Sequence, residues 1–211
     1  MTPIKITTHE TAETLTGKSK WWGAPDLPLT IPYPYTTYID EDGEEYCQPL
    51  TFICQIRLKD ISQHDTEGLL PHNGMLYFFA DIDYFLGEDA PLVMPLHNYS
   101  GDMIRVIYTE EENGLEPYEI TWEGTDESVF RKAEEIRFND TAEDYCHELL
   151  GQPFESEVAD AYPNAISLLS IQEDDRWRLR FFDCGTMYFL IDKTDLRQGD
   201  FTKIRSEVWF Y

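Results

Sequence analysis

The sequence comprises 211 residues, of which 42% are hydrophobic and 14% aromatic, so the chain can bury the core of one large domain. Its 41 acidic residues against 16 basic ones give a formal net charge of −25. A field of this sign repels nucleic acid and anionic membranes and attracts basic proteins. The simpler interpretation, in which the charge only keeps the protein soluble, stays open.

Three features of the sequence bear on its location. Residues 1–18 lack an apolar run behind a basic start, which predicts no secretory signal. No stretch approaches the ~20 apolar residues of a membrane helix. Four scattered cysteines without CxxC spacing indicate neither a disulfide framework nor a zinc ribbon: Cys47, Cys54, Cys146 and Cys184. Together these features predict a reduced, cytoplasmic protein.

The elements of the first part of the chain follow from local composition. Residues 10–15, ETAETL, predict a short helix, and residues 25–34 predict extended coil because proline removes backbone donors. Residues 103–109 and 118–124 alternate as a strand pair. The Asn-Gly turn signal at residues 113–114 lies between these two segments.

Two further helices are predicted, over residues 126–138 and over residues 142–150. The second has apolar residues at i, i+3, i+4, i+7 and i+8, which are Ala142, Tyr145, Cys146, Leu149 and Leu150. Asp140 or Thr141 supplies its N-cap, and Gly151 suits the left-handed residue that closes a helix. Its apolar stripe predicts packing against a sheet.

The clearest organisational feature is an internal echo. Residues 74–81 read GMLYFFAD and residues 185–192 read GTMYFLID, with glycine, tyrosine, phenylalanine and aspartate in the same places. Each is preceded by an apolar run that carries a glutamine, Gln55 or Gln172. The aromatic and β-branched content and the short length predict strands, buried on both faces.

These patterns predict an α+β protein. We expect mixed, mostly antiparallel sheets with a few helices, built from pseudo-duplicated strand-loop-strand units in one compact domain over residues 1–211. The related halves are expected around residues 45–90 and 160–211. Two copies favour a duplicated fold over a solenoid, which usually needs three or more repeats.

Five motifs in order resemble the YwqG-like family of bacterial proteins, a family of unknown function. They are SKWWGAPDLP from Ser19, PLTFICQI from Pro49, LLPHNGMLYFFAD from Leu69, ELLGQP from Glu148 and DCGTMYFLIDKTDLRQGDF from Asp183. The resemblance covers roughly Ser19 to Tyr211 and implies an α+β fold, a cytoplasmic location and no established enzymatic activity. Some relatives lie beside toxin genes, which implies a role as immunity proteins. The family defines no catalytic residues.

The stretch WWGAPDLPL, residues 21–29, supplies the candidate interaction residues. Successive side chains of an extended backbone point to opposite sides, so we expect one of Trp21 and Trp22 to be in the core and the other partly exposed. An exposed tryptophan would be an anchor for a partner protein.

The sequence suggests no catalytic, cofactor or metal residues. No histidine pair has metal-ligand spacing, and Cys146 and His147 are adjacent, so their side chains diverge on a helix. DEDGEEY, residues 40–46, lacks the full calcium-loop pattern and predicts a solvated turn. Asp81 and Asp83 could bind a cation, although acids at a strand end more often cap it. Cys184 lacks a local base or helix N-terminus to activate it.

A stripe of arginines is the one concentrated basic feature. RWRLRFF predicts a half-buried strand, with Trp177, Leu179 and Phe181 on one face. The opposite face carries Arg176, Arg178 and Arg180. These three could recognise an anion, but we favour the interpretation that they neutralise acidic neighbours.

Two functions follow from these observations. The first is a noncatalytic protein-interaction module, such as an immunity protein against a basic toxin, with no turnover. The second is an enzyme or small-molecule-binding protein with its site in a cleft between the two pseudo-repeats. Pairwise convergence of Asp, Arg or His side chains in space would favour the second.

Overall fold

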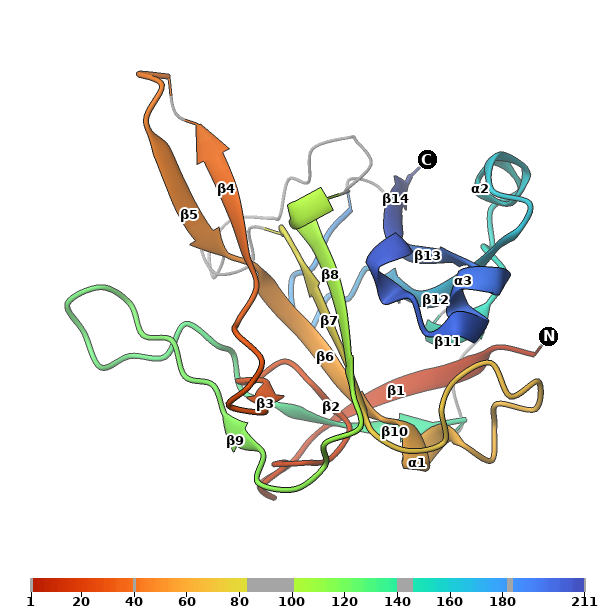
Figure 1. Cartoon of the computed structure of the whole chain (residues 1–211), viewed down its shortest axis with the longest axis horizontal. Helices are drawn as coiled ribbons and strands as arrows, with labels where there is room; N and C mark the ends of the chain where they lie inside the picture. The colour runs from red at the N-terminus through yellow and green to blue at the C-terminus, as the bar shows by residue number, and fades with distance from the viewer. Residues whose placement is uncertain (1, 40, 83–100, 140–145, 182–183, 211) are drawn as a thin grey trace.

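A computed structural model describes residues 2–39, 41–82, 101–139, 146–181 and 184–210. Strands make up most of the regular secondary structure of the described chain (Figure 1). The strands are β1 (Ile4–Glu10), β2 (Lys20–Trp21), β3 (Asp26–Leu27), β4 (Tyr35–Ile39), β5 (Glu45–Pro49), β6 (Thr51–Arg57), β7 (Met75–Ala80), β8 (Ile104–Thr109), β9 (Glu116–Pro117), β10 (Glu134–Phe138), β11 (His147–Gly151), β12 (Ala165–Gln172), β13 (Thr186–Asp192) and β14 (Arg205–Trp209). The helical turns are α1 (Leu58–Ile61), η1 (Gly101–Met103), α2 (Ser156–Ala161), α3 (Lys193–Gln198) and η2 (Phe201–Lys203).

The α+β prediction is wrong, because the fold is a sheet protein whose described residues are 42% strand and 12% helix. Ten strands form one antiparallel sheet in the order β14-β13-β12-β11-β1-β10-β2-β6-β7-β8. Two two-stranded sheets, β3-β9 and β4-β5, are attached to it. The three α-helices in the described part of the chain have only four to six residues each, so none can form a layer on the sheet.

The ten-stranded sheet curves so strongly that it nearly closes on itself around the main core. Phe78 of β7 and Phe189 of β13 meet edge to face with their ring centroids 5.4 Å apart, although their strands lie near opposite ends of the sheet. Smaller clusters cover the outer faces of both ends. β7 and β12 are therefore buried on both faces, which is why their sequences are continuously apolar.

The strand predictions from the internal echo are confirmed individually. Residues 74–81 and 185–192 form β7 and β13, and the apolar runs before them form β6 and β12. The two strands with the Tyr-Phe pair occupy the same place, second from each end of the sheet.

The strand order is also symmetric about the central β1–β10 pair. β2-β6-β7-β8 on one side matches β11-β12-β13-β14 on the other, and β10 pairs with β2 as β1 pairs with β11. The pairing slips at the same place in both halves, at Ile53 in β6 and at Leu168 in β12. Descent of the halves from a duplication stays a prediction.

The strand pairing shows which residues of the two halves are equivalent, and it differs from the sequence echo at the two glutamines. Tyr77 pairs with Gln55, whereas Tyr188 pairs with Ser170, so Gln172 lies two residues beyond the position that matches Gln55. Each half contains a Gly-x-Pro sequence, at residues 23–25 and at residues 151–153. Both tyrosine hydroxyls form a hydrogen bond with the residue that follows this sequence in their own half. Tyr77 Oη donates to the carbonyl of Asp26 at 2.6 Å. Tyr188 Oη accepts the Phe154 N–H at 3.0 Å.

The helix predicted over residues 142–150 is wrong where it can be checked, because residues 147–151 form β11. Ala142 and Tyr145 lie outside the described residues. Leu149 and Leu150 are both buried because Leu150 has φ of 55°, which turns its side chain back toward the side that Leu149 occupies. Two adjacent buried leucines imitate the i+7 and i+8 positions of a helical stripe.

Three other predictions along the chain are corrected. Residues 10–15 are not helical, and residues 126–138 form irregular chain followed by β10. Residues 103–109 contain the predicted strand β8, but β8 pairs with β7 and not with residues 118–124. For β10 and β8 a sheet partner from a distant part of the chain overrides the local pattern.

Candidate functional site

Trp21 and Trp22 are both buried, with 0% and 2% of their surface exposed, so the expected exposed tryptophan is not found. Trp22 has φ of 57°, which breaks the alternation of an extended backbone and brings both indoles into one core. Trp22 is equivalent to Leu150 of the other half, because the residues before them pair with equivalent positions of β6 and β12. The rings of Trp21 and Trp22 pack with Trp177 at centroid distances of 5.5 and 5.3 Å.

An open cleft of about 390 Å³ lies beside this aromatic cluster, where β1 and β11 separate. β1 pairs with β11 only over residues 4–6, whereas its pairing with β10 runs over residues 6–10. The gap is lined by the second half of β1, the start of β11 and the turn after β12. Its polar lining residues are Thr7, Thr8, His9, Cys146, His147, Gln172, Glu173, Asp174 and Arg176.

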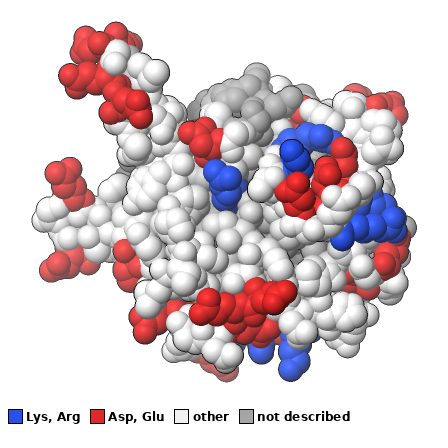
Figure 2. All heavy atoms as spheres, in the orientation of Figure 1, with Lys and Arg blue, Asp and Glu red and all other residues white. Residues whose placement is uncertain are grey.

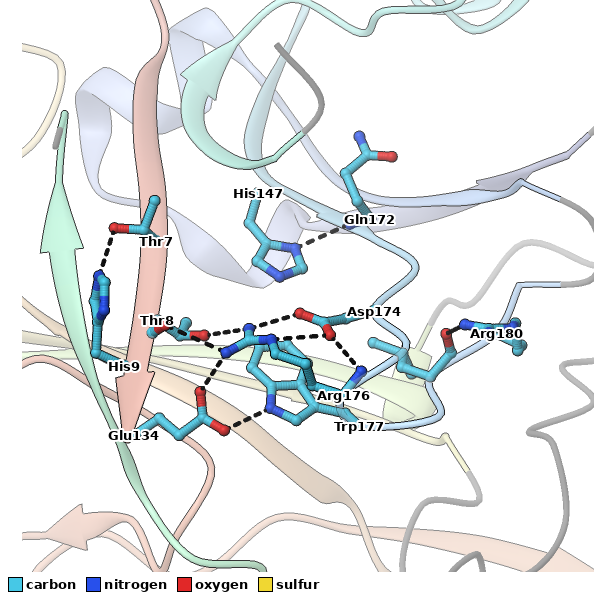
Figure 3. Close-up of polar contacts among 11 residues, drawn as sticks. Thr7, Thr8, His9, Glu134, His147, Gln172, Asp174, Arg176, Trp177 and Arg180 are labelled. Atoms are coloured by element: carbon cyan, nitrogen blue, oxygen red, sulfur yellow. Dashed lines mark hydrogen bonds and ion pairs between the residues drawn. The ribbon is translucent and has the colours of Figure 1, made fainter. Parts of the chain in front are cut away.

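His147 forms one wall of the cleft and is held in a neutral state. Its ring stacks on Trp21 with centroids 4.5 Å apart. Its Nδ1 accepts the backbone N–H of Gln172 at 3.0 Å, so the proton of the neutral ring lies on Nε2 (Figure 3). Burial lowers the pKa of His147 to about 4, although Asp174 acts in the opposite direction.

Arg176 forms the other wall, and acidic groups surround it (Figure 3). Its Nη2 lies 2.7 Å from Asp174 Oδ2 and 2.7 Å from Thr8 Oγ1, and its Nη1 lies 3.3 Å from Glu134 Oε2. Hydrogen bonding to Asp174 raises the pKa of Arg176. The guanidinium is thus already matched to two carboxylates and ties β1 to the turn after β12.

The predicted arginine strand is wrong. Residues 175–178 form a turn closed by a bridge between Asp174 and Leu179, and Arg178 has φ of 56°. Trp177, Leu179 and Phe181 are buried as expected. Arg180 contacts Asp175 and lies 3.9 Å from Glu173, so Arg176 and Arg180 bind different acids. The interpretation that the arginines neutralise acidic neighbours holds for these two.

The remaining sequence candidates do not assemble a reactive centre in the described part of the chain. Cys184 is exposed. Asp81 accepts a hydrogen bond from the hydroxyl of Tyr38, and Asp40 and Asp83 lie outside the described residues. Among the described residues no group of three His, Cys, Asp or Glu could hold a metal ion.

A buried ion pair stabilises the WWGAPD segment. Asp26 is fully buried and accepts hydrogen bonds from Lys20 Nζ at 2.8 Å, Gly17 N at 2.9 Å and Gln55 Nε2 at 2.6 Å. Burial lowers the pKa of Lys20, and Asp26 opposes that shift. These groups face one another inside the fold, so their role is to fix the segment.

Two projections extend from the body on the same side of the molecule (Figure 1). The first, the hairpin arm, comprises residues 35–39 and 41–49 and contains β4 and β5. Five residues per strand give it a length of about 17 Å. Thr37 N donates to Asp102 Oδ2 at 3.1 Å, and Tyr38 contacts Asp81, so both bonds fix the arm to the body.

The second projection, the loop arm, comprises residues 116–130. Trp122 N donates to the carbonyl of Glu127 at 2.9 Å, and Val129 N donates to that of Ile120 at 2.9 Å, which closes the loop on itself. Ile120 and Phe130 pack against the outer apolar cluster of β6 and β7. The loop arm is therefore anchored at its base, while its tip is exposed.

Acidic residues without basic ones distinguish both arms. No lysine or arginine occurs between Lys20 and Arg57, or between Arg105 and Arg131. Figure 2 shows acidic atoms over the tips of both projections, with uncharged surface between them. The exposed acids of the arms are Glu41, Asp42, Glu44, Glu45, Glu116, Glu119, Glu123, Asp126 and Glu127. Residues 40–46 alone predict no more than a solvated turn; the missing basic residues were the signal available to identify both arms.

Exposed apolar side chains accompany this charge. On the hairpin arm they include Ile39, 74% exposed, and Tyr46, 48% exposed. On the loop arm Trp122 is 37% exposed. Aromatic residues and a charged rim are features of protein-binding surfaces.

The fold and these surfaces define an acidic, antiparallel β-sheet protein with two projecting arms. The sequence profile described as a domain of unknown function, DUF1963, matches residues 19–147 and residues 118–208. The chain belongs to this family, and the match agrees with the YwqG-like resemblance of its motifs. A comparison with curated proteins returned no match. In the described part of the chain no helix is long and apolar enough to cross a membrane.

Proposed function

We propose that the protein is a noncatalytic binding module that captures a basic protein between its two arms, as an immunity protein captures a basic toxin. The observation that carries this proposal is the placement of acidic residues without any basic ones on two projections anchored to the sheet. A solvating charge needs no such segregation, whereas a complementary surface does.

The electrostatics favour this class of partner over nucleic acid. The whole-protein charge of −25 attracts a basic domain from a distance, and the arms present the charge at the surface that it reaches first. Association should therefore slow as the salt concentration rises past ~0.15 M, where the Debye length is about 8 Å. The exposed apolar side chains of the arms supply the short-range contacts that charge alone lacks.

The cleft beside His147 favours a second candidate, a small-molecule site between β1 and the second half of the sheet. Its volume of about 390 Å³ suits a small ligand. However, Nδ1 of His147 is occupied by a backbone donor and Arg176 by two carboxylates, so these groups would have to exchange existing bonds for a ligand. We therefore rank the arms first.

The test compares how much binding is lost when two charges are removed from an arm and when two charges are removed elsewhere on the surface. The probe is a fluorescently labelled peptide of alternating lysine and glycine, followed by anisotropy. One variant neutralises the hairpin arm, Glu41→Gln with Glu45→Gln, and another the loop arm, Glu123→Gln with Glu127→Gln. The matched control, Glu157→Gln with Asp160→Asn, removes two exposed charges from α2.

Each arm variant should weaken peptide binding by about 0.4–2 kcal/mol, since each lost exposed ion pair is worth about 0.2–1 kcal/mol. The control should lose much less, and a short DNA duplex should not bind the wild-type protein. Equal losses in the arm and control variants would mean that the peptide follows total charge, which would refute the arms as the site.

A further inference from the structure

Three tyrosines meet where the two arms leave the body. Tyr33 is 3% exposed and its Oη donates to the carbonyl of Leu50 at 2.6 Å, which fixes the ring. The ring of Tyr118 lies 5.2 Å from that of Tyr33, centroid to centroid, and the ring of Tyr35 lies 6.0 Å away. Tyr35 is the first residue of the hairpin arm, and Tyr118 lies near the start of the loop arm.

The two outer rings are accessible although the inner one is not. Tyr35 is 45% exposed and Tyr118 is 39% exposed. The backbone of Tyr118 is held by its N–H, which donates to the carbonyl of Pro25 at 2.8 Å, and the backbone of Tyr35 by strand pairing with Pro49. Partial burial, and then the nearby Tyr118 hydroxyl, raise the pKa of Tyr35, so its ring remains neutral. Two preformed aromatic surfaces thus lie at the base of two acidic projections.

We infer that this tyrosine junction binds an arginine side chain of the basic partner, with the guanidinium on the exposed rings of Tyr35 and Tyr118. The inference rests on the proposed function and names the residue type that the arms deliver to their base. The acidic arms concentrate cations there, and an aromatic face attracts a cation within ~6 Å of its centroid.

Arginine fits this surface better than lysine. Its guanidinium is planar, is more weakly hydrated than an ammonium ion, and can stack on a ring while its N–H groups donate to carboxylates. Exposed Glu116 and Glu119 flank Tyr118 in the chain and offer such acceptors. A lysine ammonium brings the same charge but no plane to stack, so the junction distinguishes the two cations.

The test compares two labelled peptides, one of alternating arginine and glycine and the other of alternating lysine and glycine, at equal length and salt. The wild-type protein should bind the arginine peptide more tightly, by roughly two- to fivefold for each ring engaged. Tyr35→Leu with Tyr118→Leu should remove this preference, because it weakens binding of the arginine peptide more than binding of the lysine peptide. Tyr35→Phe with Tyr118→Phe should keep it, because phenylalanine retains the aromatic face.

Phe154→Leu is the matched control and should keep the arginine preference, because Phe154 is a 46% exposed aromatic residue just before α2, away from both arms. The single variants Tyr35→Leu and Tyr118→Leu repeat the test with a smaller change, and unchanged unfolding midpoints show that the fold persists. Equal binding of the two peptides, or an arginine preference that survives the double leucine variant, would overturn the inference.

Each of the two proposals can be refuted while the other stands. If the acidic-arm variants weaken both peptides while the wild-type protein shows no arginine preference, the arms bind the partner and the tyrosine junction does not. If the arginine preference depends on Tyr35 and Tyr118 but the arm variants behave like the α2 control, the junction stands and the proposed function of the arms is refuted.

Discussion

Replacing Asp26 by asparagine tests whether the buried ion pair fixes the WWGAPD segment. Three donors, from Gly17, Lys20 and Gln55, converge on the two carboxylate oxygens of Asp26. Asparagine replaces one oxygen by an NH₂ group, so at least one donor loses its acceptor and Lys20 loses its counter-charge. Breaking a buried pair in this way costs about 3–5 kcal/mol. We expect a loss of that size in the free energy of unfolding measured with urea.

The pH dependence gives the variant a specific signature. Burial already lowers the pKa of Lys20, and without Asp26 the folded-state pKa falls further below that of the unfolded chain. Between these two pKa values the unfolded state binds the proton and the folded state does not, so stability rises with pH. Asp26→Asn should therefore regain part of its lost stability as the pH is raised toward the ~10.4 of an unperturbed lysine.

A double variant, Asp26→Leu with Lys20→Met, serves as the control. Removing both charges leaves no uncompensated ion, so it should be more stable than Asp26→Asn. The reasoning is refuted if Asp26→Asn costs less than about 1 kcal/mol, or if its stability does not rise relative to wild type in alkaline solution.

Three further predictions concern the core. Leu149→Ala should lower the free energy of unfolding by about 2–5 kcal/mol in a urea titration, because Leu149 is 0% exposed in β11; a loss below about 0.5 kcal/mol would place the strand at the surface. Because the folded-state pKa of His147 is about 4 against 6.5 for an unperturbed histidine, the unfolded state binds its proton first and stability falls as the pH drops from 6.5 to 4. His147→Gln should make this fall shallower by up to about 3 kcal/mol, and an identical slope in the two proteins would contradict the buried neutral ring. Gly74→Ala should lower the unfolding midpoint, because Gly74 has φ of 96° and an added Cβ would lie 2.3 Å from the Thr109 carbonyl oxygen; an unchanged midpoint would show that β7 and β8 can part there.

Sequence periodicity located the central strands but not the fold class. The echo of residues 74–81 in residues 185–192 identified two strands that occupy matching places, because burial on both faces leaves a continuous apolar run. The same reasoning predicted a helix at residues 142–150, where left-handed Leu150 places two adjacent leucines in the core. A single positive φ changes which side chains share a face, and residue identity at Leu150 gives no sign of it.

Composition by itself determined that the protein is strongly acidic and has enough apolar and aromatic side chains to fill a large core. The motifs determined its family. Only the tertiary structure decided that both Trp21 and Trp22 are internal, that Arg176 is matched by Asp174 and Glu134, and that acidic segments near residues 41–45 and 116–127 project as two arms. The physical reason is that these properties depend on pairing between segments far apart in the chain. Local sequence sets the preference of each segment, while long-range register sets which side chains meet.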